Sequence, residues 1–305
     1  MSKEERSFWA NPYLRMLASP LRYCTESNWR IPRDLLISLG TVGRVADPNA
    51  TFVHPASLEH PRFRRRKGGL KHYILCSKTA IGHTLRVRVI QELHVLSKQI
   101  RRGDSAQGPP LFRRLTRKEW TEFKSQGALP VENAVAILVI PPVNTDPSTG
   151  QRPEPNHTSL PREEDIQPEP RTFQRQFPPS ELRPVLRNDG WAEADELDIL
   201  PRAQIPLYNG PPLFPSRSQR AALHSAVLRV LAAEHAATKR AQLPSTPVLS
   251  GHDKGSHAIV ICSDETTLLR GDTVPLAIAL WRLRLWETEV DETGPRDTPV
   301  DWITR

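Results

Sequence analysis

The sequence predicts an α+β or α/β fold, with a small mixed sheet covered by helices and interrupted by a long Pro-rich insertion. Two apolar runs, residues 134–140 and 258–262, are rich in β-branched side chains, as strands buried on both faces are. The segments beside them carry one apolar stripe at helical spacing, which suits helices that cover a sheet. A proline-rich stretch separates the two runs, so we expect an excursion from a single domain.

The first part of the chain predicts short strands and loops. Residues 22–43 contain apolar stretches around a polar turn and predict a strand, a turn and a strand. Residues 44–69 contain several prolines and a glycine pair, so we expect a loop there. A further short strand is predicted at residues 72–76.

Four helices are predicted from apolar spacing and caps. The first runs from about residue 84 to 102, with Gly103 at its end. Thr116 and Glu119 form a capping-box pattern that begins a short second helix, which Gly127 ends. Residues 218–240 form an Ala-rich helix with one apolar stripe. The last helix begins at a cap, Asp272 or Thr273, with proline in its first turn.

These elements divide the chain into five parts. Residues 1–21 form an N-terminal segment with a possible targeting role, and residues 22–142 form a basic α/β part. Residues 143–215 are the Pro-rich, poorly ordered insertion, with one short helix expected near residues 191–197. Residues 216–290 form an αβα part that completes the same domain, and residues 291–305 form an acidic tail. Separation of two domains by the insertion is the alternative.

Charge is distributed unevenly along the chain. Residues 1–130 hold 24 Lys and Arg against 10 Asp and Glu, a net charge of +14, whereas the remainder carries −6. A basic half predicts a face that binds a polyanion, although basic charge also serves solubility or reflects an organelle bias. The densest run of basic residues combines arginine guanidinium groups, which suit phosphate contact, with one aromatic ring, which suits base stacking. The predicted nucleic-acid-binding residues are Arg62, Phe63, Arg64, Arg65, Arg66, Lys67, Lys71, Arg86, Arg113, Arg114, Arg117 and Lys118. A solvated loop or a protein-docking patch is the alternative for this run.

No catalytic residue, metal site or cofactor is predicted. The sequence contains no nucleophile elbow, P-loop or dinucleotide fingerprint. The three cysteines are widely spaced, which indicates buried thiols in a reducing compartment and argues against a zinc site. Asp264 and Glu265 follow a predicted strand, where a turn or a helix cap is the expected role. His252 and His257 flank a Gly-rich turn and make only a weak ligand pair.

The N-terminal residues favour an organelle address. Residues 7–25 contain Arg15 and Arg22 but no Asp or Glu, as in transit peptides, which predicts residence in the mitochondrial matrix. Pro12 and Pro20 limit any helix there to about seven residues. A cytoplasmic or nuclear location is the alternative. No apolar run has the length of a membrane span.

Two stretches resemble known proteins and together cover about residues 11–90. The motifs in residues 11–24 and 31–36 resemble the opening of fungal mitochondrial proteins associated with the ribosome and translation. The spacing of Arg22, Cys24, Tyr73 and Cys76 is similar to that in small bacterial RNA-binding proteins linked to translation operons. Ser27 stands where those proteins have a second cysteine, so neither a zinc site nor an RNA-binding role is carried over from them.

These observations predict a non-enzymatic accessory component of mitochondrial translation whose partner is RNA or a ribosomal particle. A protein–protein adaptor without nucleic-acid contact is the first alternative, with the Pro-rich segment as its binding region, since extended Pro-rich chain is readily recognised. An enzyme with an unrecognised site is the second alternative.

Overall fold

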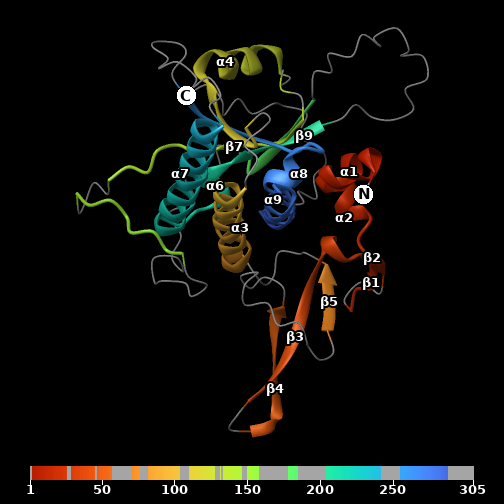
Figure 1. Cartoon of the computed structure of the whole chain (residues 1–305). Coiled ribbons are helices and arrows are strands. Elements are labelled where there is room, and N and C mark those ends of the chain that lie inside the picture. Colours follow the sequence, from red (N-terminus) through yellow and green to blue (C-terminus); the bar gives the residue numbers. More distant parts are fainter. Residues whose placement is uncertain are drawn as a thin grey trace.

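The computed structural model describes residues 2–25, 29–44, 47–56, 71–75, 82–103, 110–127, 131, 133–145, 150–157, 178–184, 204–241 and 255–287. A mixed five-stranded sheet lies between helices, and a separate three-stranded sheet projects from this body (Figure 1). The predicted class, a mixed α/β fold with a small sheet covered by helices, is confirmed.

The five-stranded sheet has the order β6-β10-β7-β9-β8. β7 and β9 are parallel, and the other neighbouring strands are antiparallel. β10 pairs with β7 along most of its length, so the prediction that the two apolar runs share one sheet is confirmed. The strands are β6 (Phe112–Thr116), β7 (Ala134–Val139), β8 (Ser180–Pro184), β9 (Gln204–Asn209) and β10 (Gly255–Cys262).

The Pro-rich region contributes two of these strands, which corrects the expectation of a poorly ordered insertion at residues 143–215. In β9, Leu207 and Tyr208 are almost completely buried beside β7. β9 contains Pro206, yet the ladder with β7 begins only at Leu207, so the missing N–H of proline costs no hydrogen bond there. The helix expected near residues 191–197 lies outside the described residues.

Helices cover both faces of the sheet. On one face α3 packs between α7 and α9, and α9 in turn contacts α2, so four helices form a row (Figure 1). α4 covers the opposite face, where Phe123 joins the second part of the core. The helices are α1 (Lys3–Ala10), α2 (Pro12–Leu17), α3 (Gly82–Arg102), α4 (Arg117–Gln126), α6 (Gly210–Leu213), α7 (Arg217–Arg240), α8 (Thr267–Arg270) and α9 (Val274–Glu287). The four predicted helices are confirmed as α3, α4, α7 and α9.

The side chains of β10 explain why this strand is apolar on both sides. Ile259 and Ile261 join the core under α3, α7 and α9. Val260 and Cys262 point to the opposite face and join the core under α4. This alternation places a strand that is buried on both faces in the middle of the sheet.

The three-stranded sheet consists of β3 (Leu36–Arg44), β4 (Asp47–Ala56) and β5 (Lys71–Leu75), with β3 in the centre. β4 corrects the expectation of a loop beginning at residue 44. Pro48 and Pro55 suggested a loop, but β4 is an edge strand, where proline is tolerated. The sheet is anchored to the body at its base, where the 3-10 helix η1 (Arg33–Leu35) receives a hydrogen bond of 2.6 Å from Arg282 Nε to Asp34 O.

The N-terminal segment is part of the fold. The Tyr13 hydroxyl donates to the carbonyl of Val135 in β7 at 3.1 Å, and the Tyr13 ring meets Trp281 of α9 edge-on. Met16 is 2% exposed, and Arg15 forms an ion pair of 2.8 Å with Asp272. Residues 1–21, expected to be a targeting segment, therefore supply core contacts in the described structure.

Candidate nucleic-acid interface

The structure separates the predicted nucleic-acid-binding residues. The run from Arg62 to Lys67, namely Arg62, Phe63, Arg64, Arg65, Arg66 and Lys67, lies outside the described residues. Lys71 is exposed on β5, in the projecting sheet at the opposite end of the molecule from α4 (Figure 1). Arg86 is engaged inside the body, where Nε donates to Leu213 O at 2.7 Å and the guanidinium pairs with Glu287. We therefore leave Arg86 out of the candidate interface.

The other four predicted residues meet where β6 passes into α4. The capping box predicted at this point is present, because Glu119 N donates to Thr116 Oγ1 at 3.1 Å and Thr116 N donates to Glu119 Oε2 at 2.8 Å. Arg113 pairs with the same carboxylate at 2.8 Å, which neutralises its charge. Burial opposes ionisation of Glu119, but hydrogen bonds from Arg113 and Thr116 hold its pKa below the ordinary value. Arg114, Arg117 and Lys118 remain exposed to solvent.

Side chains of neighbouring residues in β6 point to opposite faces of the sheet. Arg113 reaches Glu119 of α4, whereas Arg114 faces the side covered by α7. Gly255 of β10 makes room for this second side chain, because a Cβ atom at Gly255 would lie 2.4 Å from Cδ of Arg114. The Arg114 side chain thus runs from the edge strand β6 across Gly255 of β10.

Two histidines join this arginine from distant parts of the chain. His257 is exposed on β10, and partial burial, followed by the charges of Arg114 and Arg117, holds its pKa below the ordinary value. His224 lies on α7, and its pKa is lowered by burial and then by Arg114, Arg152 and His257. We call these five residues, Arg114, Arg117, Arg152, His224 and His257, the basic cluster.

The basic cluster extends the predicted site by three residues that sequence reasoning did not select. Arg152 lies in the Pro-rich region, where its charge is balanced along the sequence by nearby acids. His224 looked like one polar position on a long helix. His257 was weighed only with His252, which lies outside the described residues. Only the pairing of β6 with β10 and the packing of α7 against β6 bring them together.

The thiols and possible metal ligands show no reactive arrangement in the part of the chain that the structure describes. Cys24 and Cys262 are buried and form no disulfide, and burial raises the pKa of Cys262 to about 11, so its thiol stays protonated at neutral pH. Cys76 lies outside the described residues. Among the described side chains, no group of three or more His, Cys, Asp and Glu residues is placed to hold a metal ion.

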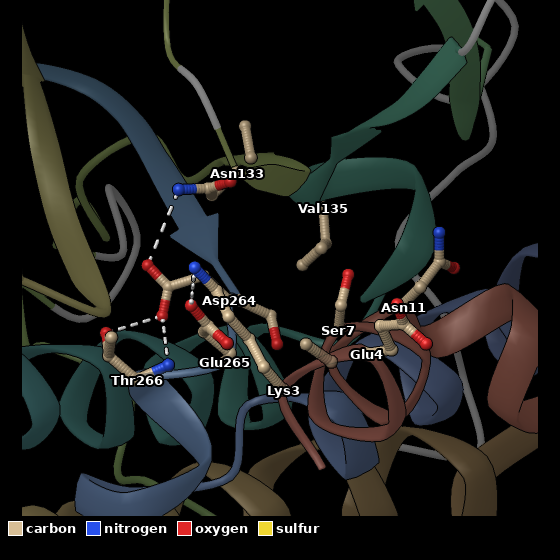
Figure 2. Close-up of a pocket in the computed structure, with 12 residues that line it drawn as sticks. Lys3, Glu4, Ser7, Asn11, Asn133, Val135, Asp264, Glu265 and Thr266 are labelled. Carbon is tan, nitrogen blue, oxygen red and sulfur yellow. Dashed lines mark hydrogen bonds and ion pairs between the residues drawn. The ribbon is translucent and has the colours of Figure 1, made fainter.

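A cleft of about 610 Å³ lies where β10 ends, between this strand and α1 (Figure 2). Asp264 Oδ1 accepts hydrogen bonds of 2.8 Å from the backbone N–H groups of Thr266 and Thr267, which begins the turn into α8. Glu265 pairs with Lys3 of α1 at 3.4 Å. The predicted role of this carboxylate pair, a turn or helix cap, is confirmed for Asp264, and Glu265 ties the N-terminal helix to the sheet.

No family model matches this chain, and neither the curated proteins nor the solved structures include a significant match. Its function is therefore inferred from the site itself. None of the described helices combines the length and the apolar composition needed to cross a bilayer.

Proposed function

We propose that this protein is a non-enzymatic RNA-binding accessory component of mitochondrial translation, and that the basic cluster is its contact with the RNA backbone. The observation that carries the proposal is the convergence of three arginines and two histidines from four separate parts of the chain. Like charges held close together repel one another in the free protein, and a bound polyanion relieves this repulsion, so their convergence supports a role in binding one.

The types of residue in the basic cluster suit phosphate. Arginine presents a planar fork of N–H donors that matches two phosphate oxygens. The adjoining Lys118, at the start of α4, adds a point charge beside the cluster. A contact made by charge alone supplies affinity with little sequence preference. The expected ligand is therefore the RNA backbone, on a free RNA or on a ribosomal particle.

Reversing the three arginines of the cluster (Arg114→Glu, Arg117→Glu and Arg152→Glu) is expected to weaken RNA binding by at least about tenfold at moderate salt. Each lost phosphate contact should also reduce the slope of log affinity against log salt by about 0.7 for a single strand. Fluorescence anisotropy with a labelled single-stranded RNA, over a series of salt concentrations, measures both quantities.

The matched control reverses Lys98, Arg102 and Lys239, which are exposed cations on α3 and α7 outside the cluster. It makes the same change in net charge, so it should retain most of the affinity. Equal losses in both variants would mean that net charge alone attracts RNA and would reject the cluster as the site. A third variant, with Arg64, Arg65 and Arg66 changed to Glu, measures the share of binding that the basic run carries.

RNA affinity is also expected to rise as the pH falls from about 7.5 to about 5.5, because the two histidines should take up protons on binding. In the free protein, burial and cationic neighbours lower both pKa values, so the rings are neutral near pH 7. Phosphate nearby favours the protonated form. Changing His224 and His257 to Asn should abolish the rise, measured by anisotropy at constant ionic strength.

His235→Asn is the control for this pH dependence, since His235 is exposed on the same helix and lies outside the cluster. The lowered pKa values also mean that protonation of these histidines destabilises the folded state, with stability lost as the pH falls below about 6.5. Circular dichroism at each pH must therefore show a folded protein. A parent protein whose RNA affinity does not change with pH contradicts the assignment of the histidines.

Residence in the mitochondrial matrix belongs to the same proposal and is supported by the acid-free residues 7–25. Cleavage of this segment after import would remove the core contacts of Tyr13 and Met16. A targeting role for it thus requires that the segment be retained. Microscopy of the full-length chain with a C-terminal tag tests the compartment, and a cytosolic or nuclear signal rejects it.

A further inference from the structure

Large apolar side chains gather on the outer side of the N-terminal segment. Ten large hydrophobic side chains are exposed in the described part of the chain, and seven of them lie between positions 8 and 29. Trp29 is 70% exposed, and Phe8, Leu17 and Leu21 are each more than 60% exposed. These seven residues, which we call the apolar face, are Phe8, Trp9, Leu14, Leu17, Leu21, Tyr23 and Trp29. A concentration of this kind marks an interaction site.

The apolar face is held in a defined orientation because its elements are anchored from the other side. In α2, Met16 points into the body, whereas Leu14 and Leu17 point outward. α2 is the last helix of the row that covers the sheet, as Figure 1 shows, so its outer side has no neighbour in that row. The strands β1 (Leu21–Tyr23) and β2 (Arg30–Pro32) continue the face as a small antiparallel ribbon.

The exposed charges on the ribbon are positive, whereas the first turn of α1, one turn before Phe8 and Trp9, carries Glu4 and Glu5. Residues 7–25 contain no Asp or Glu, and Arg22 and Arg30 are exposed on the ribbon between the apolar side chains. Trp, Tyr, Phe and Leu beside Arg are the composition of protein surfaces that lie in the headgroup region of a membrane. Acidic lipids attract such cations, so the face matches an anionic bilayer in both polarity and charge.

We propose that the apolar face docks onto the surface of an anionic lipid bilayer, with its side chains inserted among the headgroups and no segment crossing the membrane. Two other occupants fit less well. A second copy of the chain would bring Arg22 and Arg30 against like charges. A peptide partner needs a groove or pocket for its anchors. The cleft beside α1 is lined by its inner residues, Lys3, Glu4, Ser7 and Ala10, and by none of the seven.

The lipid surface and the RNA occupy opposite ends of the molecule. The basic cluster lies at the β6 edge of the sheet beside α7, and the apolar face lies beyond α9 at the other end of the helix row (Figure 1). A protein docked through its N-terminal segment would thus present its basic cluster to RNA on the side away from the membrane. The docking proposal does not depend on the RNA proposal, because different residues carry each.

Cosedimentation of the full-length protein with vesicles tests the docking. Binding should be roughly tenfold or more stronger when a third of the phosphatidylcholine is replaced by phosphatidylglycerol. Changing Leu17, Leu21 and Trp29 to Gln should weaken binding to the anionic vesicles by at least about tenfold. The matched control changes Leu182, Leu228 and Leu285 to Gln, which are the three other exposed leucines in the part of the chain that the structure describes, and should bind as the parent does.

Insertion of the tryptophan side chains into the bilayer is measured separately, by fluorescence quenching. Brominated lipid should quench the fluorescence of the parent protein, and the Trp9→Phe, Trp29→Phe variant should lose most of this quenching. Absence of binding to anionic vesicles by a folded parent protein would overturn the proposal. Concentration-dependent dimers in analytical ultracentrifugation that Trp29→Gln abolishes would overturn it in favour of a second copy. The Arg114→Glu, Arg117→Glu, Arg152→Glu variant should keep its vesicle binding, which separates failure of this proposal from failure of the proposed RNA contact.

Discussion

Replacing Glu234 with alanine is expected to lower the free energy of unfolding by about 3–5 kcal/mol, because it leaves the charge of Arg270 buried without its partner. The two side chains are 6% and 7% exposed, and Arg270 Nη2 lies 3.1 Å from Glu234 Oε2. Glu234 Oε1 also accepts the backbone N–H of Leu111 at 3.1 Å, where the chain enters β6. Urea denaturation followed by circular dichroism measures the change.

Burying the Glu234–Arg270 ion pair costs free energy, and breaking the buried pair costs free energy as well. Burial raises the pKa of Glu234 above its ordinary value, against the opposing charge of Arg270 and the backbone N–H of Leu111. A double replacement by apolar residues of similar size, Glu234→Met with Arg270→Met, should therefore recover much of the stability that Glu234→Ala loses. If the single and double variants were equally unstable, the pair would contribute through its backbone hydrogen bonds and not through its charge.

Changing Met16 to alanine is expected to lower the free energy of unfolding by about 2–5 kcal/mol, whereas the same change at the next residue, Leu17, should cost no more than about 0.5 kcal/mol. Met16 is 2% exposed and fills the space between α2 and the body, but Leu17 is 61% exposed. Urea denaturation of the two variants in parallel gives both values. Both substitutions replace a large apolar residue of α2 with alanine, so the two variants differ mainly in whether the replaced side chain is buried or exposed.

The outcome at Met16 decides whether the N-terminal segment belongs to the folded protein. A cleaved targeting peptide would contribute nothing to the stability of the mature chain, so both variants would unfold at the same urea concentration. Unequal unfolding would instead support a retained segment. Leu17→Ala should then weaken vesicle binding while leaving stability nearly unchanged, because the same side chain belongs to the apolar face.

Features that depend on neighbouring residues were predictable from the sequence. The spacing of apolar side chains and the caps at Thr116 and Gly127 are local properties, and α3, α4, α7 and α9 lie where they predict. The two apolar runs became β7 and β10, since a strand buried on both faces has to be apolar on both faces. The uneven charge was likewise visible, and it drew attention to Arg114 and Arg117.

Features that depend on long-range pairing were not predictable in this way. Pro206 concealed β9 and Pro55 concealed β4, because the effect of a proline depends on whether its missing N–H has a partner in the sheet. Arg86 shared the sequence signature of the exposed cations, yet its contacts with Leu213 and Glu287 hold it inside. The charge of a residue is local information, but its exposure is set by what packs over it.

By itself, the sequence determined the helices α3, α4, α7 and α9, the central strands β7 and β10, the excess of basic charge in the first 130 residues and the buried character of its described thiols. Only the tertiary structure decided that Arg114 and Arg117 meet Arg152, His224 and His257, since β6 must pair with β10 and pack under α7 to join them. It also decided how the N-terminal segment packs. The acid-free residues 7–25 suggested a targeting segment, and the fold buries Met16 and leaves Leu17 exposed, because α2 ends the helix row and has the body on one side only.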